Sequence, residues 1–101
     1  EFFLKKAFND SEIDMAVGRK KDSFLAGNFA TKEAFVKALG TGFRGVELKD
    51  LAVLRDELGK PFIKICNNLN RHLQGIDENK IHVSISNTDS LAIAMVVIET
   101  D

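Results

Sequence analysis

A long helical pattern that stops at a glycine constrains the fold of this chain more than any other feature. Between about residues 23 and 39, large apolar side chains recur at helical spacing and form one stripe, made of Leu25, Phe29, Val36 and Leu39. A neighbouring line of small residues, where another element can approach closely, consists of Ala26, Ala30, Ala34 and Ala38. Either Asp22 or Ser23 is the expected cap, and Gly40 supplies the left-handed conformation that commonly ends a helix. The sequence therefore predicts one amphipathic helix that packs against another element.

The remaining patterns predict antiparallel strands. Two strand-like runs, residues 50–56 and 60–66, are separated by only three residues and indicate a hairpin. Residues 81–86 alternate, with one apolar face made of Ile81, Val83 and Ile85. The run 91–99 is apolar on both faces, which is typical of a central strand.

Short helices are expected on either side of the first hairpin. Asn9 or Ser11 can cap a helix that runs to Val17, and Asn67 or Asn68 can start another that ends at Gln74. Helices mixed with antiparallel strands define an α+β fold, a small domain with the long helix packed on the sheet.

The 101 residues are expected to form a single domain, because the chain contains no repeat, low-complexity tract or linker. The opening EFFLKKAF is apolar and lacks a cap, which suggests that an N-terminal segment precedes it.

Composition excludes several classes of function. The chain is 45% hydrophobic and 29% charged, which is typical of a globular domain, and its net charge of −1 offers no basic field for nucleic acid or a membrane. No apolar run approaches the ~20 residues that span a bilayer, and no signal peptide is evident. The lone Cys66 lies in an apolar stretch, so we expect a buried structural thiol in a reducing compartment. The sequence therefore predicts a cytoplasmic protein.

Charged residues inside the long helix permit two interpretations. Glu33 and Lys37, four residues apart, fall on the seam between the large apolar side chains and the alanines, and Lys32 falls inside the apolar stripe. In the first interpretation Glu33 and Lys37 form a surface ion pair and Lys32 extends its ammonium to solvent. In the second, the carboxylate binds a metal and the lysine binds phosphate oxygens. Position alone does not decide between them.

The loop GTGFRG, residues 40–45, follows this helix instead of opening one. Its glycines allow backbone N–H groups to approach an anion, but the P-loop spacing is absent. A capped helix followed by a turn explains the same residues.

Four segments together resemble one family. They are FNDSE (8–12), FLAGNFATKEAFVKALGTG (24–42), GKP (59–61) and HVSISN (82–87). In this order they are similar to the holo-acyl-carrier-protein synthases, the small trimeric class of 4′-phosphopantetheinyl transferases, and the resemblance covers nearly the whole chain.

The resemblance implies a reaction. The phosphopantetheine arm of coenzyme A is moved to a serine of an apo acyl carrier protein, with Mg²⁺, and adenosine 3′,5′-bisphosphate is released. It implies that Glu33 is the metal ligand and that Lys37 reaches the diphosphate as the second catalytic residue. It also implies a homotrimer with active sites between subunits. The carrier protein, whether of fatty-acid or polyketide synthesis, is left open.

The resemblance also implies the residues that bind coenzyme A. Gly40, Thr41 and Gly42 are expected along the pantetheine and phosphate path. Lys20 and Phe24, with Arg19 and Lys21, are expected at the nucleotide 3′-phosphate, and Pro61 at the adenine. Coenzyme A is further assigned to Asn28, Asn87 and Thr88.

This chain departs from the family pattern in three places. The initial strand with Gly-x-Asp, whose aspartate is the second Mg²⁺ ligand, is absent from the sequence, Asn28 replaces an arginine, and Asn87 replaces a histidine. Both asparagines lack a charge, so coenzyme A is expected to bind more weakly unless the basic cluster 19–21 compensates. A catalytically silent homologue, acting as a nucleotide-binding or assembly module of a larger synthase, is the alternative.

Neither histidine is expected to be catalytic. His82 shares its strand face with serines and has no evident acidic neighbour, which favours a structural role, and His72 lies in a polar segment expected at the surface.

Overall fold

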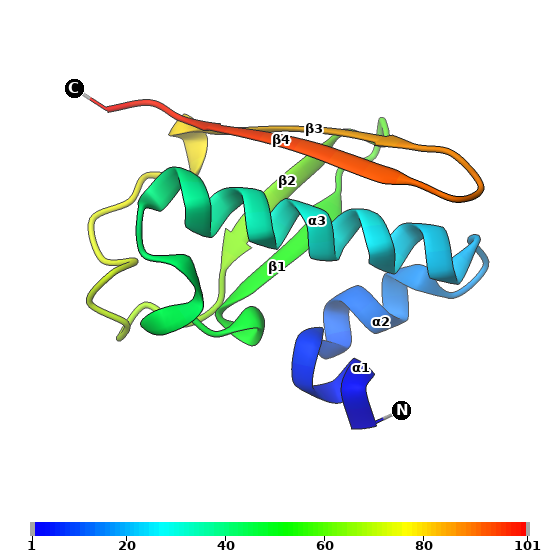
Figure 1. The fold of residues 1–101 in the computed structure, drawn as a ribbon, viewed down its shortest axis with the longest axis horizontal. Coiled ribbons are helices and arrows are strands. Elements are labelled where there is room, and N and C mark those ends of the chain that lie inside the picture. The colour runs from blue at the N-terminus through cyan, green and yellow to red at the C-terminus, as the bar shows by residue number, and fades with distance from the viewer. Residues whose placement is uncertain (1, 101) are drawn as a thin grey trace.

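The longest element, α3 (Lys21–Leu39), is the helix on which the other elements are arranged (Figure 1). The computed structural model describes residues 2–100. Helix α3 ends as predicted at Gly40, whose φ of 90° is left-handed and whose N–H donates to Val36 O and Lys37 O. Its predicted start is wrong, because the N-cap is Lys20 and neither Asp22 nor Ser23. The helix begins earlier because the N–H of Phe24, a buried residue, already donates to Lys20 O.

Two short helices precede α3. Helix α1 spans Phe2–Ala7, and α2 spans Asp10–Ala16 with Asn9 as its N-cap. The backbone N–H of Asn9 donates to Glu12 Oε1 at 3.1 Å, which is one half of a capping box. The predicted helix after Asn9 is therefore confirmed, although it ends one residue before Val17.

The strands form two antiparallel hairpins, as predicted. Strand β1 (Leu51–Arg55) pairs with β2 (Pro61–Ile65), and β3 (Ile81–Asn87) pairs with β4 (Ala92–Ile98). Three short 3₁₀ helices lie between these elements, η1 (Gly42–Arg44), η2 (Leu48–Asp50) and η3 (Glu78–Lys80). Helix α3 packs along β4 and also contacts β1, and β2 lies beside β3, so the helix lies against both hairpins (Figure 1). The α+β fold class is confirmed.

Strand β4 does not have the predicted central position. In the described residues it pairs with β3 alone. Its residues alternate between half-buried and exposed. With Leu91, which directly precedes the strand, the outward apolar row consists of Leu91, Ile93, Met95 and Val97, with exposed fractions of 50% to 65%. Only one of its two apolar faces therefore packs against the rest of this chain.

Residues 67–75 form consecutive turns, so the helix predicted there is wrong. The side chains of two asparagines accept hydrogen bonds from nearby backbone, Asn67 Oδ1 from the N–H of Leu69 and Asn70 Oδ1 from the N–H of His72. These local bonds stabilise turns in competition with helical bonds.

Two clusters of buried apolar residues make the core. The larger joins α3 to the strands through Phe35, Val36, Val46, Leu51, Val53, Ile63, Leu73 and Ile81. The smaller joins α1 and α2 to α3 through Ala7, Phe8, Ala16, Phe24 and Leu25. Cys66 belongs to neither cluster, because it is exposed just after β2, and the prediction of a buried thiol is wrong. Partial burial raises the pKa of this thiol, which makes it a poor nucleophile near neutral pH.

A buried ion pair lies where these elements meet. Lys32 Nζ is 2.7 Å from Glu12 Oε1, and both side chains are fully buried, so the interpretation in which Lys32 extends to solvent is wrong. The ammonium also donates to Ala7 O and Leu48 O, at 2.9 and 2.8 Å, which uses all three of its hydrogens. Burial lowers the pKa of Lys32, and the Glu12 carboxylate opposes that shift.

The Glu12 carboxylate is equally saturated. Oε1 accepts from Lys32 and from the N–H of Asn9, while Oε2 accepts from Asn28 Nδ2 at 3.0 Å and from the N–H of Val53 at 3.1 Å. Because every polar atom has a partner, the pair is tolerated in the core and fixes one arrangement of α1, α2, α3 and β1.

Removing either partner should destabilise the fold strongly. We expect Glu12→Ala or Lys32→Met to lower the free energy of unfolding by about 3–5 kcal/mol, because each leaves an uncompensated charge in the core. Urea denaturation followed by circular dichroism measures the change. Asp14→Ala, at an exposed carboxylate on the same helix, is the control, and a midpoint for Glu12→Ala equal to that of the control would contradict this account.

Candidate functional site

Most of the predicted site residues lie in two groups toward opposite ends of α3. This helix of 19 residues is about 28 Å long. Glu33, Lys37 and the loop Gly40–Gly42 lie toward its C-terminal end, whereas Lys20 and Phe24 lie at its N-terminal end. The structure thus arranges them along one helix without bringing them into a single pocket.

Glu33 and Lys37 are both exposed, one turn apart on α3. No ion pair joins them, so the surface ion pair of the first interpretation is not formed. Lys37 lies in the last helical turn, where a positive charge interacts favourably with the helix dipole. A carboxylate and an ammonium group are therefore both exposed to solvent, and no ion pair holds either side chain within residues 2–100.

The loop after α3 is shaped by its glycines. Gly40 and Gly42 have positive φ of 90° and 59°, a conformation that residues with a Cβ rarely adopt. Thr41 Oγ1 donates to Gly42 O at 2.8 Å, and the N–H of Thr41 donates to Val36 O. The turn interpretation of this loop is thus confirmed, while its predicted role in binding phosphate stays a prediction.

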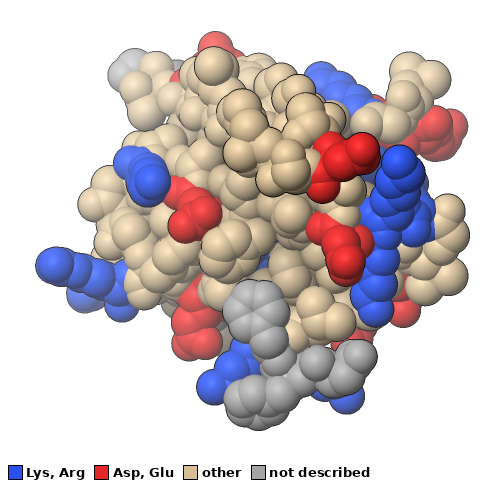
Figure 2. All heavy atoms as spheres, turned by 45° about the vertical axis from the view of Figure 1, so that its right-hand side comes forward, with Lys and Arg blue, Asp and Glu red and all other residues tan. Residues whose placement is uncertain are grey.

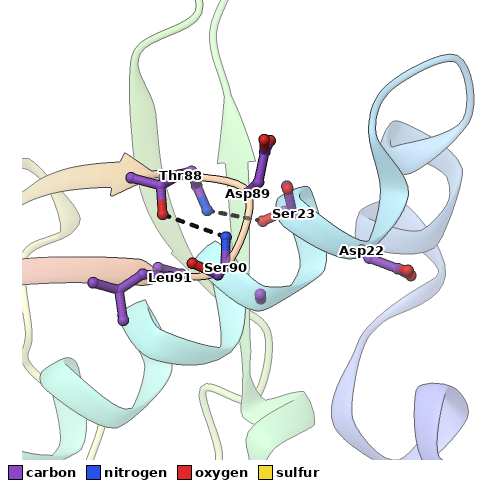
Figure 3. Close-up of a pocket in the computed structure, with 9 residues that line it drawn as sticks. Asp22, Ser23, Thr88, Asp89, Ser90 and Leu91 are labelled. Carbon is purple, nitrogen blue, oxygen red and sulfur yellow. Dashed lines mark hydrogen bonds between the residues drawn. The ribbon is translucent and has the colours of Figure 1, made fainter.

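Asn87 and Thr88 line a pocket of about 210 Å³ between the β3–β4 turn and the start of α3 (Figure 3). Asn87 Nδ2 donates to Ser23 O at 3.2 Å and so ties the turn to the helix. Thr88 Oγ1 accepts from the N–H of Ser90 at 3.4 Å. Asp22 and Asp89 also line this pocket, and Figure 3 shows the Asp22 side chain pointing away from the turn.

The side chains of Phe24 and Asn28 are buried and not exposed to solvent. Asn28 is fully buried, donates to Glu12 Oε2 and Val53 O, and accepts from Arg55 Nη1 at 3.1 Å. Its amide therefore belongs to the buried polar network and offers no exposed atom to a ligand. Lys20 is exposed at the N-cap of α3.

Pro61 lies apart from both groups. It lines a separate pocket of about 230 Å³ between the two hairpins, together with Lys60, Phe62 and His82. The structure therefore does not bring the residue assigned to the adenine next to those assigned to the phosphates.

Sequence reasoning missed Arg55, at the end of β1. Its Cζ lies 4.5 Å from the centroid of the Phe24 ring, and Arg19 Cζ lies 5.3 Å from the same centroid. Burial, and secondarily the charge of Arg19, lowers the pKa of Arg55, although an arginine stays protonated. The contact with Asn28 joins residues 27 positions apart, so no local pattern could have revealed it.

The histidines differ in part from the prediction. His82, for which a structural role without an acidic neighbour was expected, is exposed, and its Nε2 is 2.7 Å from Glu99 Oε1. His72 is half-buried, because its ring packs on Gly45.

No metal cluster is preformed in the part of the chain that the structure describes. Residues 2–100 contain no group of three His, Cys, Asp or Glu side chains placed to hold an ion. On the face shown in Figure 2, basic and acidic side chains are interspersed, so neither sign dominates that face. None of the described helices has the length and apolar character needed to cross a membrane.

Comparison with known proteins identifies the family. Residues 1–96 match the model of the 4′-phosphopantetheinyl transferase superfamily. A holo-[acyl-carrier-protein] synthase of Clostridium perfringens is 47% identical over 102 residues, covering 96% of this chain and 77% of that protein. Among solved structures, the Neisseria meningitidis holo-[acyl-carrier-protein] synthase matches with a TM-score of 0.85 and 34% identity, over 99% of this chain and 82% of that one. The Helicobacter pylori enzyme in complex with coenzyme A matches with a TM-score of 0.81 and 30% identity, over 97% and 82%.

The chain therefore belongs to the 4′-phosphopantetheinyl transferase superfamily. The expected enzyme class, a transferase of the holo-acyl-carrier-protein synthase type, is confirmed.

The loop after α3 depends on a close contact between Gly45 and His72. A Cβ at Gly45 would overlap the His72 ring at Nε2. Gly45 O also accepts from Asn70 Nδ2 at 2.6 Å, which ties the loop to the 67–75 turns. We expect Gly45→Ala to destabilise the protein by about 1–3 kcal/mol through overpacking.

His72→Ala should relieve most of that loss in the double variant, a coupling that a thermodynamic cycle of urea midpoints measures. Strictly additive effects of the two substitutions would contradict the contact.

Proposed function

We propose that this protein transfers 4′-phosphopantetheine from coenzyme A to a serine of an apo acyl carrier protein, with Mg²⁺, and releases adenosine 3′,5′-bisphosphate. The serine oxygen bonds to the phosphorus that carries the pantetheine, the bond from that phosphorus to the bridging oxygen breaks, and the serine proton is released. The observation that carries the proposal is the similarity to holo-acyl-carrier-protein synthases across 96% of this chain.

Lys37 supplies positive charge to this reaction. Its ammonium is exposed, and no carboxylate among the described residues forms an ion pair with it, so it is available to diphosphate oxygens. Charge that develops on the leaving phosphate is stabilised by a cation already in position. We assign Lys37 to this contact and to assistance in removing the serine proton.

Glu33 is the proposed Mg²⁺ ligand. Its exposed carboxylate is the hard oxygen donor that Mg²⁺ prefers, and Mg²⁺ sites commonly combine one or two carboxylates with substrate phosphates and water. The described residues offer no three-ligand cage, which fits a site completed by the substrate. When bound, the ion would neutralise charge on the diphosphate.

The alternative, a catalytically silent nucleotide-binding or assembly module, is favoured by one observation. Asn28, which replaces an arginine of the family pattern, is fully buried and hydrogen-bonded to Glu12 and Val53, so it presents no charge to a nucleotide. The further proposed features are coenzyme A contacts at Lys20, Phe24, Thr41, Pro61, Asn87 and Thr88. The cytoplasmic location and the absence of nucleic-acid partners stay predictions from sequence.

A carrier-protein assay separates the two functions. The protein is mixed with apo acyl carrier protein, coenzyme A and Mg²⁺, and mass spectrometry reports whether the carrier protein gains one phosphopantetheine arm. We expect the arm to be added in the presence of Mg²⁺ and not when the ion is chelated. Coenzyme A binding without any transfer would favour the silent module.

Two substitutions on α3 test the assigned roles. Glu33→Ala should abolish Mg²⁺-dependent turnover, and Lys37→Ala should lower kcat by roughly 10²-fold or more while changing coenzyme A affinity less. Steady-state kinetics of carrier-protein modification measures both. Glu57→Ala and Lys49→Ala, at exposed positions elsewhere, are the matched controls, and full activity in Glu33→Ala would refute the metal assignment.

The outward face of β4 supports the proposed homotrimer. The row Leu91, Ile93, Met95 and Val97 is apolar and exposed, and a small chain gains stability when copies of itself cover such a face. Closed symmetry is the usual form of such assemblies.

Met95→Glu should therefore dissociate the assembly, because a charge in an apolar interface stays uncompensated. Analytical ultracentrifugation is expected to show a trimer for the unmodified chain and a monomer for the variant, with transferase activity lost as well. Leu58→Glu, at a leucine that is 95% exposed in the β1–β2 turn, should leave the trimer intact. If the unmodified protein sedimented as a monomer, the proposed homotrimer would be refuted.

A further inference from the structure

Two arginines from different elements flank one aromatic ring at the N-terminal end of α3. Arg19 precedes the helix, Arg55 ends β1, and both guanidinium groups lie beside the ring of Phe24. They are close enough for the charge of Arg19 to lower the pKa of Arg55. The fold therefore holds two like charges together around a buried side chain.

The Glu12 carboxylate offsets this repulsion only in part, because it opposes the lowering of the Arg55 pKa less than burial and Arg19 favour it. Within residues 2–100, neither guanidinium forms an ion pair, and the buried Glu12 carboxylate is already saturated by its four hydrogen bonds. Lys20 and Lys21 add positive charge at the same helix end, where the helix dipole is also positive and Asp22 is the acidic residue of the first turn. Such an arrangement is unfavourable in the free protein, and a bound anion would relieve it.

Arg55 is held in place with donors to spare. Its Nη1 donates to Asn28 Oδ1 at 3.1 Å and to Leu54 O at 3.3 Å, while Nε and Nη2 have no partner among the described residues. Arg19 likewise uses only Nε, which donates to Met15 O at 2.9 Å. Because Asn28 is fixed in the buried network, it orients the Arg55 guanidinium before any ligand arrives.

We propose that Arg55 is a phosphate-binding residue of the substrate site and that Asn28 is its positioning residue. Guanidinium groups bind phosphate oxygens through paired N–H donors, and the ring of Phe24 supports the planar group from one side. Arg55 thereby supplies the guanidinium that position 28 of this chain does not carry.

The inference rests on the proposed function, which supplies coenzyme A as the ligand. Coenzyme A carries a diphosphate and a 3′-phosphate, and Glu33 and Lys37, assigned to the diphosphate, lie nearer the other end of α3. The 3′-phosphate is therefore the group that Arg55 receives.

Binding of coenzyme A and of 3′-dephospho-coenzyme A distinguishes these phosphates. We expect isothermal titration calorimetry to show that the unmodified protein binds coenzyme A at least roughly tenfold more tightly than the dephospho form, since a hydrogen-bonded charge pair contributes about that much. Arg55→Gln should lose most of this preference while its affinity for the dephospho form is unchanged. Arg55→Lys should also lose most of it, because an ammonium lacks the fork of donors.

Arg71→Gln, which removes the same charge from an exposed position in the 67–75 turns, is the control and should keep the full preference. Thermal unfolding of each variant confirms that it is folded, and Arg55→Lys carries the test if Arg55→Gln does not fold. Retained preference in the Arg55 variant, or equal weakening of both ligands, would overturn the inference. The inference would also be overturned if the unmodified protein bound coenzyme A and 3′-dephospho-coenzyme A equally tightly. If the unmodified protein bound neither ligand, the proposed function itself would be refuted.

Discussion

The buried contact between Glu12 and Lys32 is the constraint on which the rest of the structure depends. It joins α2 to α3 at 2.7 Å, and its further bonds reach Ala7 in α1, Leu48 in η2 and Val53 in β1. A buried ion pair is not by itself strongly stabilising, since desolvation offsets much of the attraction. What it provides is a single rotational setting of α3. With Lys32 turned inward, the next residue is rotated by about 100° around the helix, and Glu33 and Lys37 share an outward face.

Much of the fold could be predicted because its signals are local and periodic. The stripe of α3, its end at Gly40, the alternation of β3 and the β1–β2 hairpin all follow from spacing along the chain. The errors arise where non-periodic interactions decide. Hydrogen bonds to asparagine side chains stabilise turns in residues 67–75 in place of the predicted helix. Strand β4 has two apolar faces, and a single chain covers only one of them. Lys32 was misplaced because its acidic partner lies 20 residues away.

The candidate site was predictable to a similar extent. The helical wheel placed Glu33 and Lys37 at the edge of the apolar stripe, and the structure leaves both exposed. Gly40 and Gly42 adopt the positive φ that glycine permits. Asn28 could not be read as a buried residue, because its partners come from α2 and β1. The same holds for Arg55, which reaches Phe24 and Asn28 only in the folded chain. Residues that are positioned by long-range contacts cannot be identified from local sequence patterns.

The inward turn of Lys32 has a consequence for how sequence motifs are understood. Lys32 and Glu33 are adjacent in the sequence, yet the first anchors the helix to its neighbours and the second is exposed at the position proposed for a metal ligand. A homologue without transferase activity would still need Lys32 for folding, whereas Glu33 could be substituted without loss of stability. The presence of both residues in a sequence therefore indicates the fold more reliably than it indicates catalytic activity.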